Sequence, residues 1–164
     1  MQEYFMLEAI NQAKIAESYD EVPIGCVIVY NGEIIAKGYN YKENDQNPLL
    51  HAELMAIEQA CKVIGSWRLI DCDLYVTLEP CPMCSGAIVQ ARMRNVYYGA
   101  YDYKCGCGGT NYNLMNDEKF NHRCNVYGWL MEDECKQLLK DYFAKKRQLK
   151  KELKKAEKEK DYQM

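Results

Sequence analysis

The chain of 164 residues lacks both a long apolar run and a basic lead into one near its start. Its longest apolar stretch, around residues 22–30, is far shorter than the roughly 20 residues that a membrane-spanning helix needs. The opening residues, MQEYFMLEAI, are acidic and do not have the pattern of a signal peptide. We therefore expect neither a membrane helix nor a secretory leader.

Histidine is also scarce, because the chain holds only His51 and His122, whereas cysteine is abundant at nine residues. An odd number of cysteines in a chain without an export signal favours reduced thiols and metal ligation over a disulfide framework. We therefore expect a cytoplasmic protein in which the thiols are free or bind a metal.

Positive charge is scarce in the body of the chain and concentrated at its end. Residues 145–164 hold nine Lys or Arg and four Asp or Glu, a balance of +5, whereas the first 144 residues hold twelve basic and twenty acidic groups. A basic tail on an acidic body is a hint of a polyanion partner. The alternative is a solvated helix laced with charges, and the composition leaves both open.

Periodicity and turn signals predict one domain in which helices alternate with strands. The hairpin is predicted around Asn31-Gly32, a strong turn signal. The expected elements are a helix at 3–17, a hairpin at 23–40, a loop at 44–50, a helix at 51–65, a strand at 72–79, a helix at 82–93, a strand at 95–100, a Gly-rich irregular stretch at 101–124, a short strand within 125–130 and a long helix at 132–160 with a solvated, frayed end. This order favours a layered α/β sandwich.

The stretch LEPCPMCS, at residues 78–85, places two prolines and two cysteines close together. Proline cannot donate a ladder hydrogen bond, so the strand should end here, and Pro82 suits the first turn of a helix. The spacing Cys81-x-x-Cys84 fits a redox pair, half of a zinc site or two unrelated buried thiols. If it is half of a zinc site, further ligands must come from elsewhere.

His51 is a candidate for the missing ligand, because it stands at the predicted start of another helix. One imidazole and two thiolates would leave the fourth tetrahedral position open, as in catalytic zinc sites. Glu53, in the first helical turn, could reach the same point and move protons to and from zinc-bound water. Singly, a capping histidine and a pair of buried thiols are ordinary features. The combination H-x-E with P-C-x-x-C is the pattern of zinc-dependent nucleobase deaminases.

With these motifs, the sequence resembles the bacterial tRNA-specific adenosine deaminases of the cytidine/deoxycytidylate deaminase superfamily. The resemblance runs over residues 6–147 and includes the stretches EVPIGCVIV, GYN, HAELMAI, TLEPCPMCSGAI, YGAYD, NHR and DECKQLLKDYF. It implies a three-layer α/β/α sandwich with a central mixed sheet and a C-terminal helical extension. Residues 1–147 would form the zinc-dependent deaminase domain, and residues 148–164 a basic, solvated helical tail.

The resemblance also implies an activity. His51, Cys81 and Cys84 would hold one zinc ion per subunit, and Glu53 would shuttle protons. Hydroxide would attack C6 of the wobble adenosine in a tRNA anticodon stem-loop, and ammonia would leave to give inosine. Members of this group usually work as homodimers, with both subunits contributing to the RNA surface.

Further residues match substrate-contact positions of the group. Asn40 would hydrogen-bond the flipped base, and Ile24 beside Pro23 would form an apolar wall of the pocket. Asn40 could instead be a turn residue, and Ile24 a core residue of a strand. The candidates for phosphate contact are Lys104, Arg123, Lys146 and Arg147, with Arg92 and Arg94 as further ones; each could equally be a solvated surface charge.

Two alternatives stay open at the level of function. The same zinc residues could serve a deaminase of free bases or nucleosides such as guanine, cytosine or cytidine, or a non-catalytic zinc-containing RNA-binding subunit. The presence of Glu53 argues against the second. The residues Cys105, Cys107, His122 and Cys124 could form a second zinc site, or they could be reduced thiols and a histidine in a loop.

Overall fold

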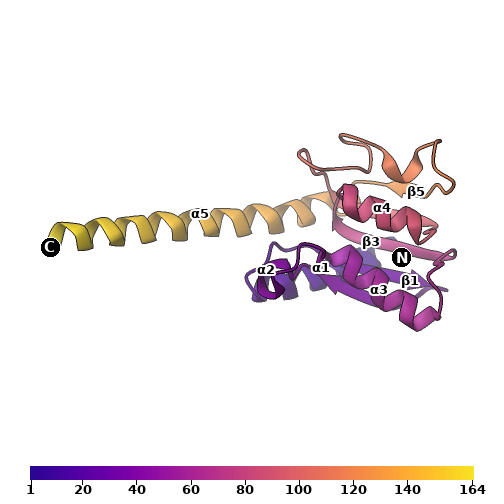
Figure 1. Cartoon of the computed structure of the whole chain (residues 1–164), viewed down its shortest axis with the longest axis horizontal. Helices are drawn as coiled ribbons and strands as arrows, with labels where there is room; N and C mark the ends of the chain where they lie inside the picture. Colours follow the sequence, from indigo (N-terminus) through magenta and orange to yellow (C-terminus); the bar gives the residue numbers. More distant parts are fainter.

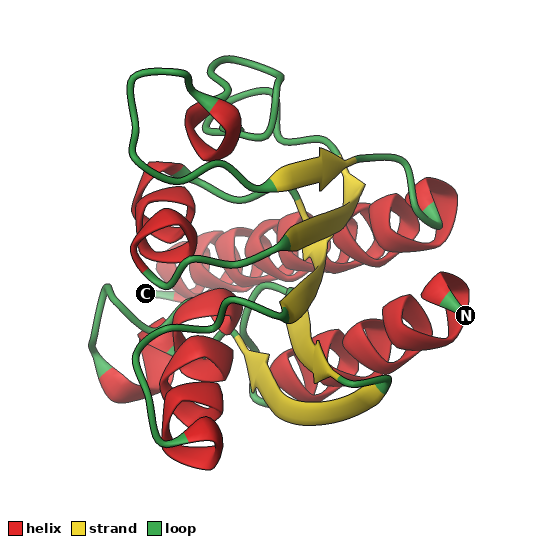
Figure 2. Ribbon diagram, turned by 90° about the vertical axis from the view of Figure 1, so that its right-hand side faces the viewer, coloured by secondary structure: helices red, strands yellow, loops and turns green.

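A computed structural model describes all 164 residues, and its centre is a five-stranded mixed sheet with helices on both faces (Figure 2). The strand order is β2-β1-β3-β4-β5; β1 is antiparallel to β2 and β3, whereas β3, β4 and β5 are parallel. The elements in chain order are α1 (Gln2–Ser18), β1 (Gly25–Tyr30), β2 (Glu33–Tyr39), α2 (Lys42–Asp45), α3 (Ala52–Ile64), β3 (Cys72–Leu78), α4 (Pro82–Gln90), β4 (Asn95–Ala100), the 3-10 turn η1 (Leu114–Asn116), β5 (Asn125–Tyr127) and α5 (Glu132–Gln163). The predicted three-layer α/β/α architecture is confirmed.

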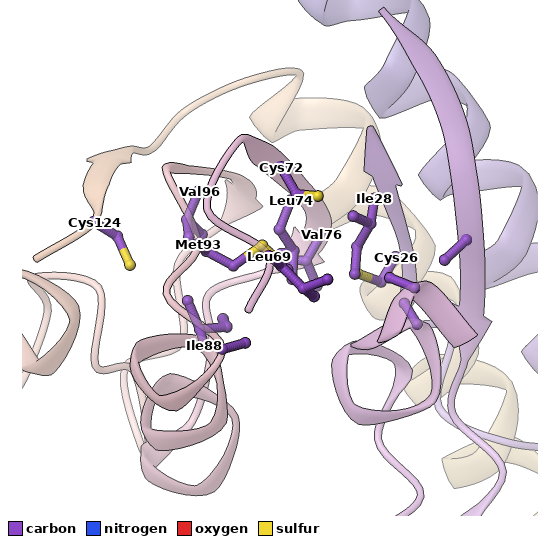
Figure 3. Packing of buried hydrophobic residues seen from close by; sticks show 14 of the residues in the cluster. Cys26, Ile28, Leu69, Cys72, Leu74, Val76, Ile88, Met93, Val96 and Cys124 are labelled. Atoms are coloured by element: carbon purple, nitrogen blue, oxygen red, sulfur yellow. The ribbon is translucent and has the colours of Figure 1, made fainter. Parts of the chain in front are cut away.

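The two faces of the sheet carry separate apolar clusters, because successive side chains of a strand point to opposite faces. In β1, Cys26 and Ile28 pack in the cluster beneath α3 and α4, whereas Val27 and Val29 pack with α1 and the start of α5. Figure 3 shows the first cluster, in which side chains of β1, β3 and β4 meet Ile88 of α4.

Most predicted elements lie where the sequence placed them. The helix predicted at 3–17 is α1, whose apolar face is buried, and the hairpin turns at Asn31 and Gly32 with φ of 50° and 77°. Positive φ at both turn residues is what the tight turn of a two-residue hairpin requires.

Four boundaries differ from the prediction. The expected loop at 44–50 gives its first two residues to the short helix α2; α4 ends at Gln90 rather than 93; the irregular stretch contains η1; and α5 continues to Gln163 rather than 160. The helix α4 ends early because Arg92 adopts a left-handed conformation, with φ of 63°. The helix α2 forms because the buried carboxylate of Glu21 accepts hydrogen bonds from the N–H groups of Glu43 and Asn44, at 3.1 and 2.8 Å.

Helix α5 packs on the sheet only with its first part and then leaves the body as a long rod (Figure 1). Its last contacts with the body are at the end of α1, where the Tyr142 hydroxyl donates to the carbonyl of Asp20 and Lys146 pairs with the Asp20 carboxylate. Every residue from Arg147 onwards is exposed. None of the helices combines the length and the hydropathy that crossing a bilayer would demand.

Candidate active site

Two helix N-termini meet at the carboxyl end of β3, and each brings a predicted metal ligand. His51 is the N-cap residue of α3, and Cys81 is the N-cap residue of α4, with Pro82 in its first turn. Neither side chain caps its own helix. Both are therefore free to point toward the partner helix, and Cys84 joins them from the first turn of α4.

The three side chains have the geometry of a zinc site. The Sγ atoms of Cys81 and Cys84 lie 3.6 and 3.4 Å from Nδ1 of His51, and the three ligand atoms lie within 4.8 Å of one another. Tetrahedral zinc at its usual bond lengths sets sulfur and nitrogen about 3.6 Å apart. Two sulfurs and an imidazole also favour zinc over hard cations. Zinc therefore fits these residues as the cofactor.

The pKa values of the two thiols are shifted in opposite directions. Hydrogen bonds from Cys84 and His51 lower the pKa of Cys81 to about 4, so Cys81 is a thiolate at neutral pH. The pKa of Cys84 is raised, first by its hydrogen bond to Cys81 and then by burial. One proton must therefore leave the pair before both sulfurs can bind zinc as thiolates.

Glu53 lies beside these ligands and is only 4% exposed. Burial raises the pKa of its carboxyl to about 7. A group whose pKa lies near the working pH can both take up and release a proton efficiently. Its place on the cavity wall next to His51 suits it to proton transfer.

The ligands open into a cavity that also contains the predicted substrate residues Asn40 and Ile24. Its lining consists of Val22, Ile24, Asn40, Lys42, His51, Glu53, Leu78, Glu79, Cys81, Asp102 and Cys105. Pro23 is buried and does not line it, whereas its neighbours Val22 and Ile24 do.

Asn40 has a role that its sequence context did not indicate. Its Oδ1 accepts a hydrogen bond from the N–H of Ala52, at 2.9 Å, at the start of α3. Asn40 thus accepts a hydrogen bond from a free N–H group at the N-terminus of α3, which the side chain of His51 does not cap. The amide nitrogen of Asn40 has no protein partner and is free to donate to a molecule in the cavity.

The basic candidates fall into three groups. Lys104 is exposed on a groove next to the cavity, and Arg147 is exposed on α5. Lys146 forms an ion pair with Asp20, at 2.5 Å, and Arg123 donates a hydrogen bond to the carbonyl of Glu118. The remaining two, Arg92 and Arg94, lie at the turn into β4, at the end of the sheet away from the cavity.

The four residues considered for a second zinc site do not come together. Cys105 borders the cavity, Cys107 donates to the carbonyl of Cys105, and Cys124 is buried in the core. His122 lies with Nε2 2.6 Å from the carbonyl oxygen of Met93. The only group of three or more metal-binding side chains is His51, Cys81 and Cys84. The loop is thus a set of separate thiols and a histidine.

Three charged residues of the cavity were not singled out in the sequence: Lys42, Glu79 and Asp102. Glu79 had one visible signal, because it is a charged residue at the end of the strand predicted at 72–79. It is 2% exposed, and nothing in the local sequence shows what its charge would bind.

The comparisons with known proteins agree with this geometry. The family model for the cytidine and deoxycytidylate deaminase zinc-binding region matches residues 1–100. The tRNA-specific adenosine deaminase of Bacillus subtilis (strain 168) is 50% identical over 149 residues, 91% of this chain and 92% of that protein. A solved structure from work on tRNA:A34 deaminases is 41% identical with a TM-score of 0.80, over 83% of this chain and 99% of that one. The guanine deaminase of Bacillus subtilis is 37% identical with a TM-score of 0.60, over 76% and 83%.

Proposed function

Because the chain belongs to the cytidine and deoxycytidylate deaminase family, we propose that it hydrolyses adenosine to inosine at the wobble position of a tRNA anticodon. Water adds to C6 of the adenine, and the amino group leaves as ammonia. The observation that carries this proposal is the open cavity in which His51, Cys81 and Cys84 meet Glu53 and the free amide of Asn40.

Each side chain of the cavity has a part in this reaction. His51, Cys81 and Cys84 would hold zinc, which when bound would supply the Lewis acidity that makes water a nucleophile at neutral pH. Glu53 takes up a proton from the attacking water and delivers it to the leaving amine, which its buried position and raised pKa allow. The amide of Asn40 donates to a ring nitrogen of the base, and Ile24 packs against the ring.

A target in an anticodon loop suits such a cavity. A base in a single-stranded loop is already partly unstacked, so turning it into a pocket costs less than extruding it from a duplex. In this proposal Lys104 and Arg147 contact the phosphates of that loop; the exposure of Lys104 on the groove beside the cavity and of Arg147 on α5 supports this.

The second candidate is a deaminase of free purines, which the similarity to guanine deaminase favours. The relation to the tRNA enzymes is closer in both identity and coverage. Incubation with an anticodon stem-loop carrying adenosine at the wobble position should give inosine. The same preparation should not turn over free guanine, cytosine or cytidine. Turnover of a free base without inosine in the stem-loop would move the assignment to the second candidate.

We propose that the active species is a homodimer, and that it works in the cytoplasm. Support for the dimer is an apolar depression on the outer face of α3 and α4, lined by Ile57, Cys61, Trp67, Ala87, Gln90 and Ala91. Ala87→Glu should convert a dimeric mass in light scattering into a monomeric one.

The proposal that the protein works in the cytoplasm is supported by a tRNA substrate and by a thiolate site that needs reducing conditions. Cell fractionation tests it.

We further propose that the deaminase domain ends near residue 147 and that residues 148–164 are an accessory tail. The tail adds about 24 Å of helix beyond the body. It begins on the side of the molecule where the cavity lies, because Leu139 and Phe143 of α5 share a groove with Val22, Leu78 and Asp102. This origin of the tail supports the proposal that it lies along an RNA bound at the cavity.

A further inference from the structure

Glu79 is a buried carboxylate around which the loop of residues 102–110 is built. Its oxygens accept hydrogen bonds from the backbone N–H groups of Asp102, Gly108 and Thr110, at 3.2, 2.8 and 3.1 Å. The Thr110 hydroxyl donates a fourth, at 2.5 Å. Four donors around one buried carboxylate compensate the loss of its hydration.

The chain around Glu79 fits closely against that loop. A Cβ on Gly106 would lie 2.5 Å from Cδ of Glu79, so the backbone of the loop touches the carboxylate directly. The N–H of Cys107 also donates to the carbonyl of Pro80, at 2.9 Å. The loop is therefore fastened to residues 79 and 80, immediately before the zinc ligand Cys81.

The fastened loop forms one wall of the cavity. Asp102, which donates to Glu79, also accepts the N–H groups of Lys104 and Cys105 with its own side chain, at 3.0 and 3.1 Å. Asp102 and Cys105 line the cavity, and Lys104 borders the adjoining groove. The position of these three residues thus depends on the carboxylate of Glu79.

We infer that Glu79 is a positioning residue, which holds the 102–110 loop as a substrate-facing wall at a fixed distance from Cys81. This inference rests on the proposed function, because its effect is on the binding of the RNA substrate. Glu79 lines the cavity, but the four hydrogen bonds to its carboxylate come from the loop, so we assign it no contact with the reacting atoms. It acts through Asp102, Lys104 and Cys105, and its removal should loosen the wall without removing the zinc ligands.

Glu79→Gln tests the inference in the full-length, zinc-loaded protein. The amide keeps the shape of the side chain but presents an NH₂ group to donors that need an acceptor, so at least one hydrogen bond is broken. The KM for the anticodon stem-loop should rise about tenfold or more while kcat changes much less, as expected when uniform binding is weakened. Zinc content should stay at the wild-type level, and amide exchange at Gly108 and Thr110 should become faster.

Matched variants separate positioning from general damage. Thr110→Val removes one hydrogen bond and should give a smaller rise in KM, whereas Thr110→Ser keeps the hydroxyl and should restore the wild-type value. Asp73→Asn weakens another carboxylate cluster at the opposite end of β3, with Arg94 and Asn95. It should lower the melting temperature without changing KM.

An unchanged KM in Glu79→Gln, or a loss of zinc that accounts for its whole defect, would overturn the inference. If that variant does not fold, equal KM values for Thr110→Val and Thr110→Ser would overturn it instead. A wild-type protein that fails to deaminate the stem-loop would contradict the proposed function. In that case the exchange rates at Gly108 and Thr110 still report whether Glu79 holds the loop.

Discussion

The zinc-binding cavity and the outer half of α5 are built from opposite kinds of residues. At the cavity, Cys84 is completely buried and Glu53 almost so, and the Cys84 thiol lies 3.4 Å from Nδ1 of His51. In the tail, residues 148–164 are all exposed, and no ion pair forms within them. Single substitutions in the cavity should therefore have large effects on activity, whereas the tail should affect RNA binding only through its net charge.

The largest effect should follow from removing a metal ligand from the cavity. Cys84→Ala takes away one of three zinc ligands, and we expect it to abolish deamination and to lower the zinc content well below one ion per chain. The melting temperature should also fall, because bound metal stabilises the folded state. Metal analysis and thermal unfolding measure both effects.

Cys124→Ala is the matched control for this variant, because Cys124 is equally buried but lies in the core. It should lower stability through the cavity that it leaves and keep both zinc and activity. Wild-type zinc content in Cys84→Ala would contradict the ligand assignment. A loss of zinc in Cys124→Ala would show that a second metal site exists after all.

The next largest effect should come from Glu53, the proposed proton carrier. Glu53→Gln preserves the shape of the side chain and removes its ability to transfer protons, so kcat should fall about 10²- to 10⁴-fold. Zinc should remain bound. Because burial raises the pKa of Glu53, the amide also relieves the desolvation of a carboxylate, and the melting temperature of the metal-free protein should not fall. Retained turnover would remove Glu53 from this role.

A smaller effect should separate the contact of Asn40 with the start of α3 from its proposed contact with the base. Asn40→Asp keeps an oxygen that can accept the N–H of Ala52, so α3 stays capped, but it loses the amide donor to the base. We expect KM to rise about tenfold, the scale of one or two polar contacts, with unchanged stability. Asn40→Ala should raise KM and also lower the melting temperature. Equal stability losses in both variants would mean that Asn40 serves only the helix end.

The zinc ligands were predictable because their signals are local. A histidine and a cysteine that each precede a helix must lie at the N-termini of those helices, and Pro82 fixes where the second helix begins. In an α/β fold, such helix ends gather at one edge of the sheet. The motif pattern then supplied the identity of the metal and the role that we propose for Glu53.

The walls of the cavity were not predictable for the opposite reason. Glu21 organises α2 and Glu79 organises the 102–110 loop through bonds to backbone groups more than 20 residues away. Every residue except proline has a backbone N–H group, so the sequence does not indicate which N–H groups will bond to a given carboxylate. The cap that Asn40 provides for α3 was missed in the same way, and so was the pairing of Lys146 with Asp20.

The smallest effect should come from the tail. Deleting residues 148–164 removes six lysines and four acidic residues, a net charge of only +2. We expect a modest loss of affinity for the stem-loop and a slightly shallower dependence of log K on log salt concentration, with kcat unchanged. The magnitude of that slope should decrease by about 0.7 to 0.9 for each phosphate that the tail no longer neutralises. Fluorescence anisotropy at several salt concentrations measures it.

A second variant separates the charge of the tail from its length. Replacing Lys150, Lys151, Lys154 and Lys155 by glutamine keeps a good helix former at every position and removes four charges. If the tail acts only through its charge, this variant should lower affinity and flatten the salt dependence more than the deletion does, because it leaves the four acidic residues in place. Binding that is unchanged in both variants would show that the tail makes no contact with the RNA.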